Sequence, residues 1–279
     1  MRWCGAVADY DGLRLDRVRG FVFDVDGTLV HRGADGRARP QPGAVEVLER
    51  IRATGRRLVL FTNGSHVGSA AIARGLREDG LPISDEEMLT PTDSAISYLL
   101  RRHRGARTML FGSDAIAQLM RSAGIELTRE DDAAAVFVAH VNEVDFAALE
   151  RAARAVQGGA RLLTGSYARG YAGSSGMIFS RGAMTTAAIA KVTGARPRVL
   201  GKPSRAAVSE ITRRLGVPAR ELAVIGDDVG MDIALGRLGG SRTVLVRTGI
   251  SGALAVDRLP ERRRPDAVVD GVADLLERL

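Results

Sequence analysis

The sequence predicts an α/β fold in which a doubly wound parallel sheet is interrupted by an inserted second α/β domain. Short apolar runs alternate with segments of helical periodicity, which is typical of βαβ units and of a parallel sheet. The composition changes near residues 82–91, and the first pattern resumes at Arg198. We therefore expect a core domain of residues 1–87 plus 196–279 and an inserted domain of residues 88–195.

The core is organised around residues 21–30, FVFDVDGTLV. The run from Phe21 to Val25 predicts a buried strand, which ends in Asp24 and Asp26 and then turns at Gly27. In open α/β sheets the chemistry lies beyond the carboxyl ends of the strands. One of these carboxylates can attack an electrophile, and the other can move a proton. Together with a backbone carbonyl they can also hold a hard cation such as Mg²⁺, which prefers oxygen ligands.

A second strand follows the first along the chain. Residues 31–42 are rich in Gly, Pro and Arg and predict a loop, which is either a flap beside the first strand end or only a long connection. Residues 43–54 have helical apolar spacing, and residues 58–61 predict the next buried strand. A right-handed crossover makes the two strands a parallel pair, which would bring Thr62 near Asp24.

Four polar or small residues, Thr62, Asn63, Gly64 and Ser65, lie just past the end of this second strand. A hydroxyl with neighbouring backbone N–H groups at a helix N-terminus binds anions readily. We interpret Thr62 as a phosphate ligand and Ser65 as the N-cap of a helix over residues 66–79.

The inserted domain repeats the alternation of strands and helices. Apolar runs predict three strands, at residues 107–112, 134–139 and 160–164. Residues 114–123 and 145–156 predict the helices between them. The insertion is therefore a second α/β unit of about 100 residues.

Past Arg198 the core pattern returns with two further polar strand ends. Lys202 lies in a Gly-Lys-Pro turn. Another apolar strand ends in Asp227 and Asp228, and Asp232 lies on the first turn of the helix that follows. The strand that precedes Asp227 is predicted at residues 222–225. The other core elements are predicted as a helix at 204–215, a strand at 243–246, and a final short strand and helix.

The polar strand ends together supply the groups that phosphoryl transfer requires, because catalysis of this reaction consists mostly of positioning and charge neutralisation. Asp24 would attack phosphorus, and Asp26 would protonate the leaving alkoxide and then deprotonate the attacking water. Mg²⁺ held by Asp24, the Asp26 carbonyl and Asp227 would neutralise the charges. Thr62 and Lys202 would bind the phosphoryl oxygens.

The composition of the chain excludes several classes of protein. The chain has 279 residues, of which 45% are apolar, and its formal net charge is +7. No Arg-rich block alternates with aromatic residues, so the positive balance favours anionic substrates rather than nucleic acid. Cys4 is the only cysteine, which fits a reducing cytoplasm. No segment has the apolar length of a signal peptide or a membrane span.

The motifs DVDGTLV, TNG, GKP and GDD-GMD, in this order and spacing, resemble the four motifs of the haloacid dehalogenase (HAD) superfamily of phosphohydrolases. The insertion resembles the α/β cap of the class IIA branch, which includes 4-nitrophenylphosphatase-like and N-acetylglucosamine-operon phosphatase-like enzymes. The resemblance implies a Rossmann-like core with an inserted cap that determines substrate specificity.

The resemblance also implies the residues of the site. Asp24 would be the nucleophile and Asp26 the general acid/base. The phosphate-binding residues would be Thr62, Asn63, Gly64 and Lys202, the Mg²⁺ ligands would be Asp24, Asp26 and Asp227, and the supporting acids would be Asp228 and Asp232. For Asp228 and Asp232 the alternative is an acid at a helix N-terminus that complements the helix dipole.

The cap departs from the family pattern, because Thr164-Gly165-Ser166-Tyr167 stands where members of this branch often carry Thr-Asn-x-Asp. The substrate is therefore left open. Tyr167, Arg169 and Tyr171, in the loop after the third cap strand, are candidates for substrate contacts, and the alternative is an ordinary polar loop.

The sequence thus predicts a Mg²⁺-dependent phosphatase that hydrolyses a small phosphomonoester, such as a sugar, polyol, nucleotide or cofactor phosphate, through a phosphoaspartyl intermediate. We expect a cytoplasmic enzyme with no nucleic-acid or membrane partner, and the resemblance favours a homodimer. One alternative is a phosphotransferase or phosphomutase that uses the same aspartyl phosphate. Another is a basic nucleic-acid-binding protein, which salt-dependent retention on DNA without phosphatase activity would favour.

Overall fold

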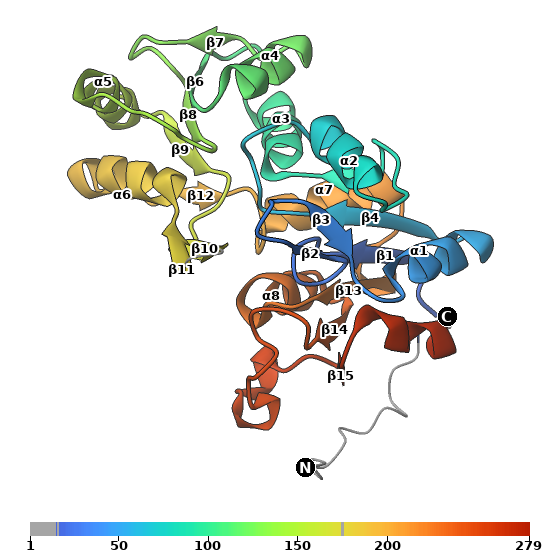
Figure 1. Ribbon diagram of the computed structural model, residues 1–279. Helices are drawn as coiled ribbons and strands as arrows, with labels where there is room; N and C mark the ends of the chain where they lie inside the picture. Colours follow the sequence, from blue (N-terminus) through green and yellow to red (C-terminus); the bar gives the residue numbers. More distant parts are fainter. Residues whose placement is uncertain (1–14, 16, 174–175) are drawn as a thin grey trace. The chain divides into compact units, whose positions relative to one another are not determined.

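The computed structural model describes residue 15, residues 17–173 and residues 176–279 (Figure 1). The chain divides into two compact units. Unit 1 comprises Met1–Phe61, Leu76–Ile83 and Ile211–Leu279, and unit 2 comprises Thr62–Gly75 and Ser84–Glu210. Unit 2 thus includes three segments, 62–75, 84–87 and 196–210, that the sequence assigns to the core domain. The division into a core domain and an inserted domain at the expected boundaries stays a prediction.

Among its described residues, unit 1 supplies five parallel strands of a six-stranded sheet. They are β1 (Gly20–Phe23), β4 (Arg57–Phe61), β13 (Leu222–Gly226), β14 (Arg242–Val246) and β15 (Ala267–Val269). Their order is β15-β14-β13-β1-β4, and Phe23 of β1 lies beside both Ile225 and Leu60. Nearly all of their residues are buried, as in parallel strands that are covered on both faces. The carboxyl ends of β1 and β13 therefore meet at one edge of the sheet.

Helices of unit 1 follow the apolar spacing of the sequence. α1 (Ala44–Ala53) buries Ala44, Val47, Leu48 and Ile51, which share one face of a helix. It packs against the 3₁₀ helix η6 (Val272–Arg278). The other helical segments are η2 (Ala219–Glu221), the π-helical turn η3 (Val229–Ile233), α8 (Ala234–Gly239), η4 (Val256–Arg258) and η5 (Glu261–Arg263).

The stretch predicted as a loop between β1 and α1 contains a short antiparallel hairpin. Its strands are β2 (Val30–Arg32) and β3 (Ala38–Pro40). Val30 and Ala38 are buried, whereas most of the residues between them are exposed. The loop prediction was wrong for these strands, because strands of three residues within a stretch rich in Gly, Pro and Arg carry no periodic signal of their own.

Unit 2 has a second parallel sheet, in the order β12-β9-β8-β6-β7. Its strands are β6 (Thr108–Phe111), β7 (Leu127–Thr128), β8 (Ala135–Val138), β9 (Arg161–Thr164) and β12 (Arg198–Val199). Its helices are α3 (Pro91–Arg102), α4 (Asp114–Ser122), α5 (Phe146–Gln157) and α6 (Arg181–Thr193). The predicted α/β class, with parallel sheets and flanking helices, is confirmed.

The central strand β8 divides the core of unit 2 into two clusters. Val136 and Val138 pack with buried residues of α5 and α6. Ala135 and Phe137 pack with buried residues of α3 and α4. Alternate side chains of a strand point to opposite faces, so one apolar strand supplies the core on both sides of the sheet.

Unit 2 also contains elements that are not strands of this sheet. They are β5 (Met88–Leu89) and an antiparallel hairpin of β10 (Gly170–Gly173) and β11 (Gly176–Phe179). The helices α2 (Ser69–Glu78) and α7 (Arg205–Leu215) begin in unit 2 and end in unit 1. Since α2 begins at Ser69, Ser65 is not its N-cap. None of the helices among the described residues has the length and apolarity that crossing a bilayer requires.

Candidate active site

Asp24 lies where β1 ends and the chain turns sharply. Its N–H donates to the Ile225 carbonyl at 2.9 Å, which continues the ladder between β1 and β13 by one residue. The next carbonyl, that of Val25, accepts the N–H of Val30 at 3.0 Å, and the N–H of Gly27 donates to the Val30 carbonyl at 2.7 Å. Gly27 has a φ of 84°, a conformation that glycine adopts without strain. The turn therefore fixes the backbone on both sides of Asp24 and Asp26.

Three carboxylates meet at this edge of the sheet of unit 1. Asp24, Asp227 and Asp232 each offer a carboxylate oxygen, and these oxygens all lie within 4.8 Å of one another. Asp227 and Asp232 are only 3% and 1% exposed. Like charges at this separation repel one another, and a divalent cation offsets that repulsion. The donors are all hard oxygen atoms, so the set fits Mg²⁺ and not a metal that requires sulfur or nitrogen ligands.

Backbone N–H groups hold the two buried carboxylates in place. The N–H of Ile250 donates to Asp227 Oδ2 at 2.7 Å. The N–H of Asp228 donates to Asp232 Oδ2 at 3.1 Å. The π-helical turn η3 begins directly after Asp228, so Asp232 lies on the first helical turn, as predicted, and that turn is wider than an α-helical one.

Asp228 and Asp232 differ in what their side chains contact. Asp228 caps η3, because its Oδ1 accepts the N–H of Gly230 at 2.6 Å. Asp232 instead belongs to the carboxylate group. The helix N-terminal alternative therefore describes Asp228, whereas Asp232 has the geometry of a metal ligand.

Two glycines allow the carboxylates to lie this close to the backbone. A Cβ atom at Gly249 would overlap the carboxylate of Asp227, and one at Gly226 would overlap the carboxylate of Asp232. The carboxylates of Asp227 and Asp232 are buried and accept backbone N–H groups, so they have little room to move.

The residues predicted to bind phosphate lie in unit 2. Thr62 Oγ1 accepts the N–H of Gly64 at 3.1 Å, and Thr62 is buried. The Asn63 side-chain amide pairs with the Lys202 backbone: its Nδ2 donates to the Lys202 carbonyl at 2.9 Å, and its Oδ1 accepts the Lys202 N–H at 2.8 Å. Asn63 thus ties the two predicted phosphate-binding turns together. The phosphate-binding role of these residues and the proximity of Thr62 to Asp24 stay predictions.

Comparison with known proteins identifies the family. A family model described as haloacid dehalogenase-like hydrolase matches residues 21–126, and a second HAD hydrolase model matches residues 199–275. The D-glycerol 3-phosphate phosphatase of Mycobacterium tuberculosis is 30% identical over 246 residues, which cover 87% of this chain and 67% of that protein. The chain belongs to the haloacid dehalogenase-like hydrolases.

Another relative and a solved structure also resemble the chain over most of its length. Ribonucleotide monophosphatase NagD of Escherichia coli (strain K12) is 26% identical over 92% of this chain and 98% of its own. A crystal structure of a Mycobacterium tuberculosis glycerol phosphate phosphatase in complex with magnesium is 26% identical, with a TM-score of 0.82, and the match covers 94% of this chain and 77% of that chain. The resemblance to the HAD superfamily and its class IIA branch is thereby confirmed.

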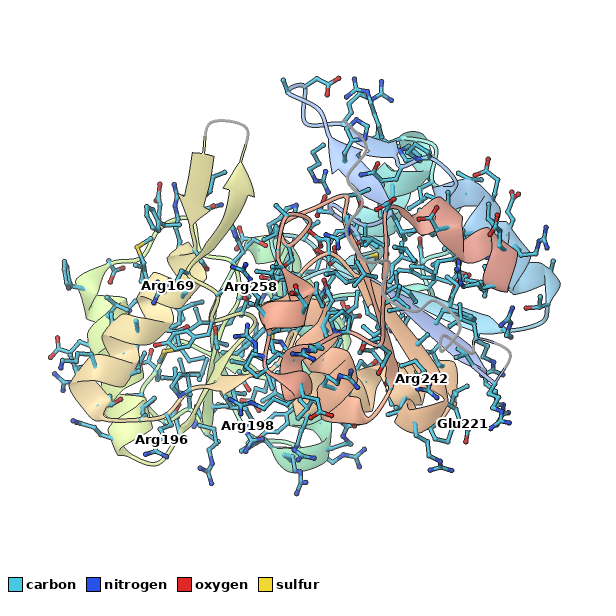
Figure 2. All side chains as sticks on the ribbon, turned by 90° about the horizontal axis from the view of Figure 1, so that it is seen from below. Arg169, Arg196, Arg198, Glu221, Arg242 and Arg258 are labelled. Carbon is cyan, nitrogen blue, oxygen red and sulfur yellow. The ribbon has the colours of Figure 1, made fainter. Side chains whose placement is uncertain are left out.

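The cap candidates of this HAD hydrolase surround the start of the β10–β11 hairpin. Tyr167 and Arg169 are exposed, and Arg169 lies directly before β10 (Figure 2). The Arg169 carbonyl accepts the N–H of Ser180 at 2.9 Å. Tyr171 lies within β10 and pairs in register with Ile178, so it belongs to a strand and not to a loop. Their contact with substrate stays a prediction.

Asp26 lies apart from the three clustered carboxylates and has a different partner. Its Oδ1 accepts the Nε–H of Arg32 at 2.6 Å, and both side chains are about half exposed. The predicted metal contact of Asp26 involves its backbone carbonyl, and that contact stays a prediction. The sequence carries no signal for a role of Arg32, because its pairing with Asp26 depends on the β2–β3 hairpin. The bridge between Asp26 and Val30 brings Arg32 back to this carboxylate.

Proposed function

We propose that this HAD hydrolase is a Mg²⁺-dependent phosphatase that hydrolyses a small phosphomonoester through a phosphoaspartyl intermediate on Asp24. The single observation that supports this best is the cluster of Asp24, Asp227 and Asp232 within 4.8 Å at the sheet edge. Phosphatases among the similar proteins, including one with magnesium bound, add support.

Asp24, Asp227 and Asp232 would hold the ion, together with the backbone carbonyl of Asp26. When bound, Mg²⁺ would neutralise the carboxylates and the phosphate dianion, so that an anionic nucleophile can approach an anionic ester. The two buried ligands are already oriented by the N–H groups of Ile250 and Asp228. Such prior orientation favours binding, because little side-chain freedom is lost.

In the first step an Asp24 carboxylate oxygen forms a bond to phosphorus. The bond between phosphorus and the ester oxygen breaks, and the ester oxygen keeps the electron pair. Asp26 gives a proton to that oxygen, so the alcohol leaves neutral. The products of this step are the alcohol and an acyl phosphate on Asp24.

In the second step a water oxygen forms a bond to the same phosphorus atom. Asp26, now a carboxylate, takes a proton from the water, and the bond between phosphorus and Asp24 breaks. The electron pair of that bond returns to Asp24. Inorganic phosphate leaves, and both aspartates regain their starting protonation states.

Thr62, Gly64 and Lys202 would bind the phosphoryl oxygens, with Asn63 holding the Lys202 backbone. A hydroxyl, a backbone N–H and an ammonium group are the donors that such oxygens require. Two of the similar proteins are named for a ribonucleotide and a glycerol phosphate. The proposed substrate class is therefore a small soluble phosphomonoester. The candidates for selecting it are Tyr167, Arg169 and Tyr171. A cytoplasmic location and a homodimer belong to the same proposal.

The test is release of inorganic phosphate from a panel of small phosphate esters, with Mg²⁺ and with EDTA. Wild type is compared with Asp24→Asn, which keeps the shape but lacks a nucleophilic carboxylate. Asp270→Asn, at a side chain that is 92% exposed, is the control for an Asp-to-Asn change elsewhere. We expect Mg²⁺-dependent release that Asp24→Asn lowers by at least about 10³-fold and that Asp270→Asn leaves unchanged.

Full activity of Asp24→Asn would show that another group is the nucleophile. Release of the alcohol without inorganic phosphate would instead indicate transfer to a second acceptor. The absence of any ester cleavage by folded wild-type protein would refute the phosphatase proposal.

A further inference from the structure

Arg32 is the side chain that contacts the proposed general acid/base. Its Nε donates to Asp26 Oδ1 at 2.6 Å, a short distance for a charge-assisted hydrogen bond. Only one oxygen of Asp26 takes part in this contact. The second oxygen therefore remains available for a proton that moves to or from a substrate.

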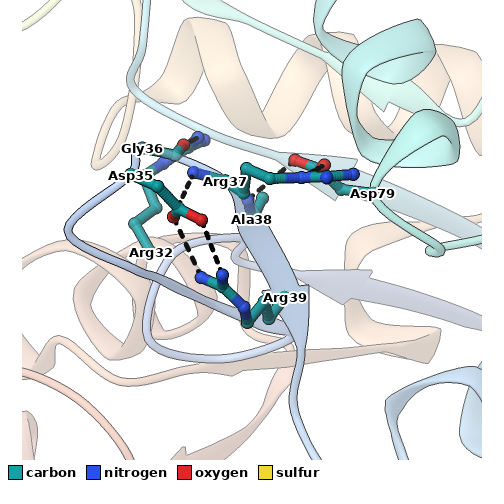
Figure 3. A network of polar contacts seen from close by, with 7 residues as sticks. All are labelled: Arg32, Asp35, Gly36, Arg37, Ala38, Arg39 and Asp79. Carbon is teal, nitrogen blue, oxygen red and sulfur yellow. Dashed lines mark hydrogen bonds and ion pairs between the residues drawn. The ribbon is translucent and has the colours of Figure 1, made fainter.

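The hairpin that carries Arg32 is held by further ionic contacts (Figure 3). Arg39 forms two hydrogen bonds to Asp35, at 3.0 and 2.6 Å. Asp79, directly after α2, accepts the Arg37 guanidinium at 2.8 Å and the Ala38 N–H at 2.7 Å. β3 is thus fixed to another segment of unit 1, and the ladder between β3 and β2 passes that restraint to Arg32.

Arg32 itself is bound at two points. Its Nη1 also donates to the Gly36 carbonyl at 3.4 Å, across the turn of the hairpin. A guanidinium is a rigid planar group, so two contacts define its orientation. This restraint allows Arg32 to fix the rotamer of an aspartate that is otherwise half exposed.

We propose that Arg32 is a positioning residue that holds Asp26 in the orientation for proton transfer, an inference that rests on the proposed function. Asp26 gives its proton from the oxygen that Arg32 does not contact, as the bond between phosphorus and the ester oxygen breaks. The carboxylate that results is then adjacent to the guanidinium, which stabilises its negative charge until it takes the proton from water.

A role in proton transfer has a signature that a structural role lacks. A basic leaving group such as phenolate needs a proton as it departs, whereas 4-nitrophenolate is stable without one. Phenyl phosphate and 4-nitrophenyl phosphate have closely similar shapes but differ in this need. Loss of a positioned proton donor therefore lowers kcat/KM more for phenyl phosphate than for 4-nitrophenyl phosphate.

The experiment measures kcat/KM for both esters, with Mg²⁺ present, in wild type, Arg32→Met, Arg32→Lys and Arg39→Met. Arg39→Met is the matched control, because the Arg39–Asp35 ion pair lies in the same hairpin. The exposed side-chain fractions are 50% for Arg39 and 46% for Asp35, close to the 49% of Arg32 and the 48% of Asp26. We expect Arg32→Met to lower kcat/KM about 10-fold for phenyl phosphate and less than about 3-fold for 4-nitrophenyl phosphate. Arg32→Lys should recover part of the loss, and Arg39→Met should affect both esters equally.

A double variant tests whether Arg32 acts through Asp26. In the Asp26→Asn background, Arg32→Met should cause no further loss that depends on the leaving group, because the proton donor is already absent. An equal loss for both esters in Arg32→Met would overturn the inference and leave the phosphatase proposal intact. Wild-type protein that cleaves neither these esters nor any other ester of the panel would overturn both.

Discussion

Two aspartates four positions apart, Asp228 and Asp232, illustrate how closely residue roles depend on local geometry. Both follow the same strand and both are acids near a helix start. The π-helical turn directs Asp232 back toward the strand end, where the N–H of Asp228 contacts it. Asp228 uses its own carboxylate to cap the turn.

This difference predicts unequal effects of the same substitution. Asp232→Asn should raise the Mg²⁺ concentration needed for half-maximal phosphatase activity by about 10- to 100-fold, because it removes a charged ligand atom from the cluster. Asp228→Asn should change it by less than about 3-fold, because asparagine is an equally good N-cap. The measurement is activity against Mg²⁺ concentration. Equal effects of the two changes would contradict the assignment of Asp232 as the ligand.

For single residues, the sequence predicts the location of acids that directly follow an apolar strand. Asp24 and Asp227 were expected at one edge because each comes directly after a buried run, and parallel strands align their carboxyl ends. The ion pair of Asp26 and Arg32 was not expected. It depends on a bridge between Asp26 and Val30 and on a hairpin register, neither of which leaves a periodic signal in the sequence.

The β2–β3 hairpin is the element whose ionic contacts are best defined. The Arg39 guanidinium, followed by the Arg37 N–H, lowers the pKa of Asp35 to about 2. The Ala38 N–H, followed by the Arg37 guanidinium, lowers the pKa of Asp79. The Asp35 side chain is exposed and its partner Arg39 is half exposed, whereas Asp79 is partly buried, so the Arg39–Asp35 contact orders the hairpin more than it stabilises the whole protein.

The sign of these shifts predicts how the hairpin responds to acid. A carboxyl group whose pKa is lower in the folded state supports the fold above its unfolded pKa of about 3.9 and loses that support as the pH falls toward the folded value. We expect NMR titration of the side-chain carboxyl carbons to give midpoints below 3.9 for both groups. The Ala38 amide should lose hydrogen-exchange protection over the same range, and Asp79→Asn should remove this pH dependence.

Titration midpoints of Asp35 and Asp79 at the ordinary value, or an Ala38 amide whose exchange is insensitive to pH in wild type, would contradict the contacts in Figure 3.

Short hairpins such as β2–β3 were not predicted from the sequence, for a physical reason. Helix α1 and strand β4 bury regular apolar patterns, whereas the two hairpins depend on antiparallel ladders of three or four residues. Their stability comes from pairing and not from intrinsic preference.

At the scale of the whole molecule, two units each contain their own parallel sheet. Alternating strands and helices predicted both sheets, because a buried parallel strand is apolar throughout its length. The limits of the units were less predictable. Residues 62–75, 84–87 and 196–210 consist mostly of turns, helix starts and the two-residue strand β12, and their assignment to a unit depends on tertiary contacts such as the Asn63 amide against the Lys202 backbone.

Metal binding should raise the stability of the folded chain. The three clustered carboxylates come from two strand ends, so the cluster forms only when the sheet of unit 1 is folded. A ligand that binds only the folded state adds about 1.4 kcal/mol of stability for each tenfold excess over its Kd. We expect Mg²⁺ to raise the thermal midpoint of wild type in calorimetry and EDTA to reverse the rise.

The control for this effect is NaCl at matched ionic strength, which screens charges without binding the cluster. Asp232→Asn should show a smaller Mg²⁺-dependent rise than wild type. An equal rise in both, or a rise reproduced by NaCl, would mean that the ion acts elsewhere on the protein.

Gly226 and Gly249 limit how the carboxylate site can be redesigned. Any side chain at either position would overlap a buried carboxylate, so neither glycine can be enlarged without displacing a member of the cluster. The size of the cluster cannot be tuned by enlarging these neighbours, in the way that binding pockets usually are. A library that seeks a different ion or a different reaction should hold these two positions constant and vary the carboxylates themselves or the exposed residues of the β2–β3 hairpin.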